Sequence, residues 1–526
     1  MSGQNSGSSQ IIDENYIQVT KKPDGTAYTD ADTDGYIIRK SNNVFLKKIL
    51  NRPLNITDFG AVGDGITDDS EAMNKALKFV TSKNIRILEF SGNNTYNLNA
   101  KSFQLPKNLL LKFSGAILKN GKFIGNNNLI SSEAIKIFDN FTLNGSFINT
   151  DNVYVEWFGT IPNDSSSVDL KNSLEKLYNV FFSVKLNQGI YYTKIGNIDI
   201  KGLTGLSPQL TFVEFDTDND GQHLFHIGKV GAKPEQRTYD NNFLKSMSLV
   251  LISKNKKIHN NSLLIIGASH QVKIDEVKFI ANSQNVSLTP IELSTLYKDD
   301  VKPTLANYAI NFNGGSELIS LNNIFTLSDV GVLFTTNTDF VNISNFTSWN
   351  GKNGLATTYF YDTTQSNILF SGSQSWSQGL FGVYARSSSN YSNFINVKFE
   401  NLRIEQLNED LKSNNKLVAS SFWFGDYTYI ANLIFSNVML AGTANGFKFG
   451  TIQDGKISLN DILVHYDAKA PRKFAFEAKL KEKGKTEIFM HNVSLAPDIQ
   501  VSIDNSTLKN TNIFENKFRN DVIVTQ

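Results

Sequence analysis

From about residue 270 onward, the chain repeats short segments rich in β-forming residues. Each segment ends in Asn, Asp or Gly and is followed by an apolar residue or, once, by serine. The segments are Leu318–Asn323, Phe340–Asn345, Asn367–Gly372, Asn393–Asn401, Tyr429–Asn437, Gly455–Asp461 and Thr486–Asn492. Their last residues lie 22, 27, 29, 36, 24 and 31 positions apart. A repeat of this size cannot bury its own core and is stable only when stacked on its neighbours. The pattern therefore predicts a solenoid of stacked β-coils.

Two repeats are similar to each other in sequence. Ser348-Trp349 recurs as Ser375-Trp376, 27 residues later. We interpret the repetition as tryptophans stacked inside the solenoid. The longest interval contains extra residues at about 408–426, which predicts a side loop that carries Trp423 and walls a binding groove.

A motif rich in glycine and aspartate, DFGAVGDGITDD at residues 58–69, precedes the repeats. Its glycines, Gly60, Gly63 and Gly65, permit tight turns. Asp68 is a candidate helix N-cap. Apolar residues then recur at helical spacing, at Met73, Ala76, Leu77 and Val80. A strand is expected at 85–90.

This motif resembles the entry of the pectate-lyase superfamily, in which a short helix covers the open end of the fold. The resemblance implies an all-β protein: a right-handed, single-stranded parallel β-helix with short N-terminal capping helices. A degraded copy of the motif follows about a hundred residues later, at Glu156–Gly159, Asp164 and a helical pattern from Leu170 to Phe181. Doubled entrances occur in bacteriophage tailspikes of this superfamily, which depolymerise capsular polysaccharide.

Residues 24–40 also resemble the segment that precedes the β-helix in many tailspikes. The resemblance implies a homotrimer on the phage tail that acts at the host cell surface and joins other virion proteins through its N-terminus. We expect four regions: 1–50 for virion attachment, 51–152 for the β-helix entry, 153–470 for the main β-helix with the active groove, and 471–526 for final coils or a trimerising cap.

Composition excludes several other classes. The 51 basic and 50 acidic residues nearly cancel, so nucleic acid is not an expected partner. Cysteine is absent, which excludes disulfides and thiolate chemistry. No apolar run is long enough to cross a bilayer, and the first ten residues lack a secretory signal. We expect no membrane insertion, no ordinary secretion and no cofactor.

Metal binding is not expected either. Residues 30–35 and 216–221 match the opening of an EF-hand loop, but the twelfth positions are Ser41 and Ile227 where glutamate is needed. The six histidines show no metal-ligand spacing. We interpret the aspartates of the entry motif as caps of turns and of a helix.

The strongest candidate for catalysis is Arg403-Ile404-Glu405. Residues two apart on a strand share a face, so Arg403 and Glu405 project together. A neighbouring guanidinium favours the ionised carboxylate that a nucleophile or base requires. The triplet also resembles one on the central coils of many tailspike depolymerases, where the glutamate is catalytic. The alternative is an exposed ion pair that only solvates the surface.

Glycoside hydrolysis generally needs a second carboxylate, roughly 5–5.5 Å away for retention or 6.5–9.5 Å for inversion. Neighbouring coils stack about 4.8 Å apart, so acids on adjacent coils are in range. Asp426 is the first choice because aromatic residues surround it in sequence, and Glu400 is the second; Glu317 and Asp329 lie further back. The expected substrate contacts are Arg403, Arg386, Trp423, Tyr384, Tyr427 and Asp362.

Two other functions remain open on the same fold. One is β-elimination on a uronic-acid polymer, with Arg386 or Arg403 neutralising the carboxylate and Tyr384 as a base. The other is a receptor-binding spike without catalysis, which needs aromatic residues but no carboxylate pair. A bacterial surface polysaccharide is the expected partner in all three.

Overall fold

The computed structural model forms two compact units, residues 1–187 and 188–526. It describes residues 53–149, 152–238, 241–253, 260–281, 306–350, 355–378, 381–386, 392–406, 420–425, 428–442, 445–466 and 486–495. It also describes shorter stretches at 10–11, 16–19, 21–22, 26–29, 37–41, 44–48, 474–480, 500–503, 513–516 and 524–525. No helix within these ranges has the length and hydropathy needed to span a membrane.

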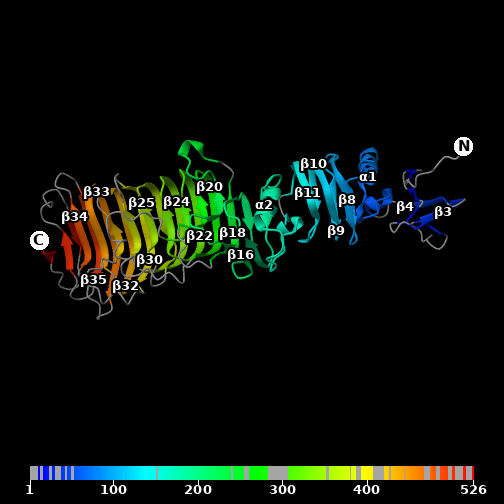
Figure 1. Ribbon diagram of the computed structural model, residues 1–526. Helices are drawn as coiled ribbons and strands as arrows, with labels where there is room; N and C mark the ends of the chain where they lie inside the picture. The colour runs from blue at the N-terminus through cyan, green and yellow to red at the C-terminus, as the bar shows by residue number, and fades with distance from the viewer. Residues whose placement is uncertain are drawn as a thin grey trace. The chain divides into compact units, whose positions relative to one another are not determined.

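The first unit begins with a small antiparallel sheet in the order β1-β2-β4-β3 and continues as a parallel sheet in the order β5-β7-β9-β10-β8-β6, with β11 paired to β10 (Figure 1). Its elements are β1 (Gln10–Ile11), β2 (Tyr16–Val19), β3 (Ile37–Ser41), β4 (Val44–Lys48), β5 (Leu54–Asn55), η2 (Ile56–Phe59), β6 (Asp64–Asp68), α1 (Ser70–Ser82), β7 (Ile87–Ser91), β8 (Thr95–Gln104), β9 (Leu110–Ser114), β10 (Ile117–Ser131), β11 (Phe138–Phe147), η3 (Val155–Phe158), α2 (Leu170–Tyr178) and β12 (Ser183–Lys185).

The entry motif folds as its glycines and apolar stripe predict. Gly60, Gly63 and Gly65 all have positive φ, at 88°, 72° and 75°. The apolar stripe of α1 is buried, at Met73, Ala76, Leu77 and Val80. The N-cap prediction is wrong by one residue: Asp69 occupies that position, while the Asp68 carboxylate accepts a hydrogen bond from the Ser70 amide (2.9 Å).

The second copy of the entry motif is confirmed, because it forms the same kinds of secondary-structure element as the first. Each copy has a 3-10 turn that ends on a left-handed glycine, Gly60 with φ 88° and Gly159 with φ 95°. In each, an aspartate accepts a bond from the amide two residues later: Asp68 from Ser70 and Asp164 from Ser166, both at 2.9 Å. A helix with a buried apolar stripe follows both turns. The same local chemistry is therefore used twice within the first unit.

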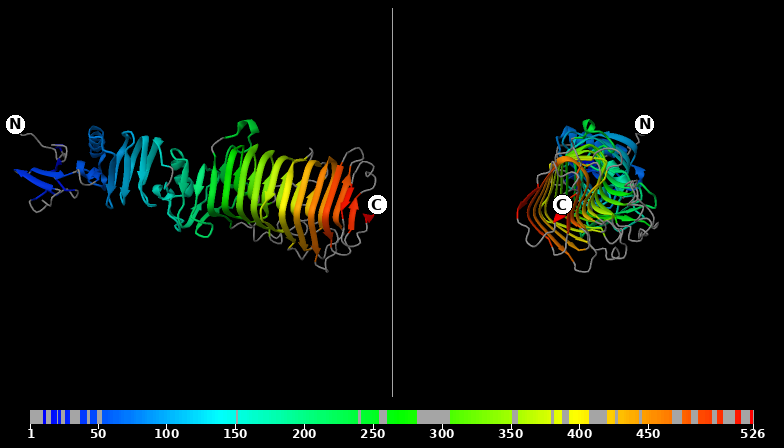
Figure 2. Two further views of the ribbon diagram at one scale, coloured as in Figure 1. Left: turned by 180° about the vertical axis from the view of Figure 1, so that it is seen from behind. Right: turned by 90° about the vertical axis from the view of Figure 1, so that its left-hand side faces the viewer.

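The second unit is a parallel β-helix, and Figure 2 shows its strands stacked one above another. Its elements are β13 (Gly189–Thr193), β14 (Ile198–Asp199), β15 (Gly202–Thr204), β16 (Thr211–Asp216), β17 (His223–Ile227), η4 (Pro234–Gln236), β18 (Phe243–Ile252), β19 (Ser262–Ile266), β20 (His270–Ala281), β21 (Tyr308–Phe312), β22 (Ser316–Ser328), β23 (Val330–Phe334), β24 (Thr338–Trp349), β25 (Ala356–Tyr361), β26 (Thr364–Ser371), β27 (Gln374–Gln378), β28 (Phe381–Arg386), β29 (Ser392–Ile395), β30 (Val397–Gln406), β31 (Ser420–Phe424), β32 (Thr428–Gly442), β33 (Asn445–Tyr466), β34 (Phe474–Leu480), β35 (Thr486–Leu495), β36 (Gln500–Ile503), β37 (Ile513–Asn516) and β38 (Val524–Thr525).

Each coil of this β-helix has three faces. In the coil of β29 to β31, residues 392–400 form the first face, which bends at Asn396 (φ 55°); residues 402–406 form the second face and residues 420–424 the third. The corner between the first and second faces is Asn401, with φ 52°. Equivalent residues of other coils pair in parallel, for example β22 with β24 and β30 with β32.

The corners lie where the sequence repeat predicts them. The predicted segment ends, Asn323, Asn345, Gly372, Asn401, Asn437, Asp461 and Asn492, all have positive φ. Asparagine tolerates this left-handed conformation better than other residues with a side chain, apart from aspartate. Stacked corner side chains also bond to each other: Asn437 Nδ2 donates to Asn401 Oδ1 (2.9 Å) and Asn492 Nδ2 to Asp461 Oδ1 (2.7 Å). Asn and Asp are therefore favoured at these corners both by the backbone conformation and by the side-chain hydrogen bonds between coils.

Replacing Asn437 with alanine is expected to cost about 1–3 kcal/mol of unfolding free energy. The change puts a Cβ without local hydrogen bonding into a left-handed corner, and it removes the bond to Asn401. Asn437→Gly keeps the backbone geometry and should lose less. Chemical denaturation of both variants checks this; an alanine variant as stable as the glycine variant would contradict it.

The interior is a stack of aromatic rings. Phe370, Phe399 and Phe435 lie on successive coils, with centroids 4.6 and 5.2 Å apart. Trp376 contacts this stack edge-on and is fully buried. The prediction that Trp376 is a core residue is confirmed.

The same prediction for Trp349 is wrong, because its side chain is 50% exposed. Before the corner Ser344 pairs with Ser371, but after it Ser348 pairs with Trp376 and Trp349 with Ser377. One additional residue is therefore accommodated at the corner of β26 and β27. A one-residue shift moves a side chain to the opposite face of a strand. The similar Ser-Trp pairs consequently point in opposite directions.

One partly buried histidine is expected to make the second unit sensitive to acid. Burial, with a smaller effect of His226, lowers the pKa of His223 from 6.5 to about 4, and its Nδ1 accepts a bond from the Ser262 amide (3.2 Å). As pH falls from about 6.5 to about 4, the His223 side chain binds a proton in the unfolded chain but remains neutral in the folded protein. Stability should therefore fall in this window, by at most about 1.4 kcal/mol per pH unit. A His223→Gln variant should show a flatter pH dependence of Tm; an unchanged slope would contradict this.

Candidate functional site

Arg403 and Glu405 project from the second face, on the part of β30 that follows the corner. Leu402 and Ile404 alternate with them and are buried in the core. Arg403 Nη2 lies 3.9 Å from Glu405 Oε2, and the two side chains are 58% and 48% exposed. The prediction that they share a face is confirmed. Exposed pairs contribute only about 0–1 kcal/mol, so folding does not require this one.

The residues in register with this pair on the two neighbouring coils are uncharged. Glu405 pairs in register with Ser377 and Ala441. Arg403 pairs with Ser375 and Met439. None of these four residues is a second carboxylate for Glu405.

Glu400 is on the same strand but on the other side of the corner. Three strand steps of about 3.3 Å separate Leu402 from Glu405, and the corner at Asn401 adds to this. Glu400 instead forms an ion pair with Lys398 on the first face. The structure does not bring Glu400 and Glu405 together.

The third face carries a cluster of aromatic side chains. Tyr359, Tyr384 and Trp423 are in register on β25, β28 and β31, with ring centroids 5.0 and 5.5 Å apart. Trp423 is partly buried, and Lys448 Nζ lies 5.2 Å from its ring centroid. Trp423 is therefore on a strand rather than on the expected side loop. Two predicted substrate contacts, Tyr384 and Trp423, lie side by side.

Arg386 ends β28 beside this cluster and is 9% exposed. It pairs in register with Tyr361, and its carbonyl accepts a bond from the Asp362 amide (3.0 Å). Arg386, Asp362, Tyr384 and Trp423 thus belong to one face. The predicted contact residues divide into this group on the third face and Arg403 on the second.

Tyr359 also belongs to the aromatic cluster. Its hydroxyl is buried and has no hydrogen-bond partner among the described residues. Burial, followed by the neighbouring Tyr384 and Tyr308, raises the pKa of Tyr359 well above its usual value, whereas Arg386 opposes the shift. The phenol therefore stays protonated. Only the register of β25 with β28 could have indicated its position.

Asp426 and Tyr427 lie outside the described residues, as does the whole of the loop at 30–35. The other EF-hand-like loop, at 216–221, is described. There Asp218 Oδ1 accepts a bond from Ser253 (3.0 Å). Across the described part of the chain, no three His, Asp or Glu side chains are grouped so that they could hold a metal ion.

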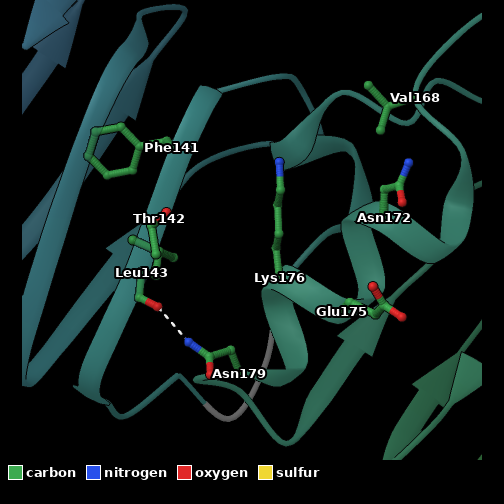
Figure 3. Close-up of a pocket in the computed structure, with 8 residues that line it drawn as sticks. All are labelled: Phe141, Thr142, Leu143, Val168, Asn172, Glu175, Lys176 and Asn179. Atoms are coloured by element: carbon green, nitrogen blue, oxygen red, sulfur yellow. Dashed lines mark hydrogen bonds between the residues drawn. The ribbon is translucent and has the colours of Figure 1, made fainter. Parts of the chain in front are cut away.

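A pocket of about 480 Å³ lies in the first unit between β11 and α2 (Figure 3). Lys176 extends from α2 into this space, and its Nζ lies 5.3 Å from the Phe158 ring centroid. Asn179 Nδ2 donates to the Leu143 carbonyl (2.8 Å). Glu175 is the one carboxylate in its lining, so the pocket has no carboxylate pair for hydrolysis.

Neither a protein-family model nor a curated protein matches this sequence. Solved structures with a similar fold include a GH87 alpha-1,3-glucanase catalytic domain in complex with nigerose (10% identity, 70% of this chain and 69% of that chain, TM-score 0.32). PfbA, a surface adhesin of Streptococcus pneumoniae, is another (13%, 80% and 93%, TM-score 0.27). A third is a tailspike protein of E. coli bacteriophage HK620 (9%, 92% and 82%, TM-score 0.28). Likenesses this distant assign neither a family nor an activity.

Proposed function

We propose that this chain is a tailspike that binds a bacterial surface polysaccharide and cleaves it by endo-hydrolysis of glycosidic bonds. Glu405 is the proposed catalytic carboxylate. In this proposal the chain is a homotrimer on the phage tail, joined to other tail proteins through residues 1–50 and acting at the host cell surface.

The observation that carries the proposal is the exposed Arg403–Glu405 pair. It stands on a rigid strand, and its in-register neighbours are uncharged. An ion pair that contributes little to stability, held on a regular scaffold, is more readily explained by chemistry at the surface than by folding. The guanidinium offers hydrogen bonds to sugar hydroxyls or to an acidic substituent.

The second acid is proposed to be Asp426; Glu400, which the structure does not bring to Glu405, is tested beside it. Glutamine and asparagine variants of each, tested one at a time, identify it. Substitution of the residue that acts with Glu405 should reduce the cleavage rate as strongly as Glu405→Gln does, because the general acid and the general base act in the same step. If neither variant affects cleavage, the partner is another residue.

A lyase is the second candidate, favoured by the third face. Arg386 and Tyr384 lie together there on β28, and elimination needs a base such as the Tyr384 phenol, which is 6% exposed. Arg386 would neutralise the carboxylate of a uronic acid. Elimination creates an unsaturated sugar that absorbs ultraviolet light, and hydrolysis does not.

The test is to spot the purified full-length protein on lawns of diverse encapsulated bacteria. Material from any halo is then examined for reducing ends and ultraviolet absorbance. Reducing ends without absorbance support the hydrolase, and absorbing products support the lyase. Binding to cells without release of fragments would leave a receptor-binding spike as the better description.

A further inference from the structure

Three charged side chains and a histidine, from separate segments, lie close together on the first face at the start of the long coils. His270, Glu317 and Asp339 are in register on β20, β22 and β24, which are neighbouring strands in Figure 1. Arg237 follows η4, and its Nη1 donates to Glu317 Oε2 (2.6 Å). His270 Nε2 lies 3.4 Å from Glu317 Oε1. Both carboxylates therefore face outward on adjacent coils, about 4.8 Å apart along the stack.

Two large apolar side chains stand beside these carboxylates. Leu318 directly follows Glu317 and is 43% exposed; Phe340 directly follows Asp339 and is 53% exposed. Each residue has positive φ, at 56° and 51°. This is an unfavourable conformation for bulky residues.

On the next two coils the position equivalent to Phe340 is asparagine. Asn367 and Asn396 also have positive φ. Asn367 Nδ2 donates to Asp339 Oδ1 (2.8 Å), and Asn396 Nδ2 donates to Asn367 Oδ1 (3.2 Å). The ladder of asparagines therefore stops where Phe340 begins. Folding alone favours asparagine at this position, so the exposed ring requires another explanation.

We propose that Phe340, Leu318, Asp339 and Glu317 form a saccharide-binding site on the first face, separate from Glu405. The Phe340 ring and the Leu318 side chain form an apolar platform for the C–H face of a sugar ring. The carboxylates of Glu317 and Asp339 accept bonds from its hydroxyls. Arg237 and His270 orient Glu317. The inference rests on the proposed function only in taking the ligand to be a glycan.

The charges of the site select the class of sugar. Arg237 neutralises Glu317, and the Asp339 carboxylate leaves the site negative. A sugar that carries its own carboxylate would be repelled. We therefore assign the site to a neutral, hydroxyl-rich part of a polysaccharide.

The decisive variant is Phe340→Asn. It extends the asparagine ladder and relieves the left-handed phenylalanine, so Tm should stay the same or rise. The probe is a printed array of purified bacterial polysaccharides, grouped as neutral, amino-sugar-containing and carboxylated. Affinity for neutral members should fall at least 10-fold. Phe340→Tyr keeps the ring and should bind as the wild type does. Ile195→Asn, the same kind of change at another exposed site (46%), is the matched control.

Unchanged binding by Phe340→Asn would overturn the proposal, as would a wild-type protein that binds only carboxylated glycans or none on the array. Glu405→Gln separates this result from the proposed function. If Glu405→Gln abolishes cleavage while Phe340→Asn binds normally, the first-face site is wrong and the hydrolase stands. If Phe340→Asn loses binding while Glu405→Gln still cleaves, the site stands and the catalytic assignment fails.

Discussion

A Glu405→Gln variant is expected to release reducing ends about 10²–10⁴-fold more slowly than the wild type on any polysaccharide that the protein cleaves. Glutamine has the same shape but cannot act as a general base, a general acid or a carboxylate nucleophile. The side chain is half exposed, and its ion pair with Arg403 is long, so fold and stability should barely change. Binding of the polysaccharide should persist, because only the chemical step loses its group.

The measurement is initial cleavage rate beside binding affinity, on one batch of polysaccharide. Glu71→Gln is the matched control: it makes the same change at an exposed carboxylate that pairs with Lys75 (3.1 Å) on α1. That control should cleave normally. A Glu405→Gln variant that cleaves at the wild-type rate would reduce the Arg403–Glu405 pair to an ordinary surface ion pair.

Trp376→Ala is expected to destabilise the second unit by about 3–5 kcal/mol, the range for removing a large buried aromatic side chain. The Trp376 ring is fully buried between Phe346, Phe370 and Phe399, with centroids 6.0, 5.6 and 6.3 Å away. Removing it leaves a cavity that the stacked coils cannot close by moving together, because their spacing is fixed by the strand pairing.

Two further variants serve as comparisons for the loss of stability in Trp376→Ala. Trp349→Ala, at the half-exposed tryptophan, should cost far less. Trp376→Phe keeps most of the packing and removes an indole N–H that has no partner among the described residues, so its cost should also be small. Denaturant unfolding of the three variants checks the order. Equal losses for Trp349→Ala and Trp376→Ala would contradict the register described for β24 and β27.

The corners of the solenoid could be predicted from sequence because their cause is local. A positive φ favours Asn, Asp or Gly, and the buried strand that follows favours an apolar first residue. Asn323, Asn401 and Asn437 all follow this rule. The two entry motifs are equally local, since aspartate carboxylates there accept bonds from backbone amides two residues later.

The direction of the repeated tryptophans could not be predicted because it depends on pairing between coils. Glycine at position 372 and serine at 373 admit an additional residue, and this shifts the register that follows. Nothing in the Ser-Trp pairs themselves reveals that shift. Spacing between corners therefore located the strands but not the inward side of each one.

The candidate sites also contain one part that could be predicted from local sequence and one that depends on the pairing between coils. Arg403 and Glu405 share a face because alternation along one strand requires it. The group around Glu317 depends on Arg237, 80 residues earlier in the chain, and on the neighbouring strands of His270 and Asp339. Such contacts follow from the stacking order of the coils, which a single sequence does not specify.

The most direct test of the central claim is the time course of reducing ends released from purified capsular polysaccharide by the wild-type protein and by Glu405→Gln. The polysaccharide is taken from a strain on which the protein forms halos, and ultraviolet absorbance is recorded in the same samples. We expect reducing ends to rise with the wild type, without absorbance, and to stay near the blank with the variant. Equal release by both proteins, or products that absorb, would contradict a hydrolase that uses Glu405.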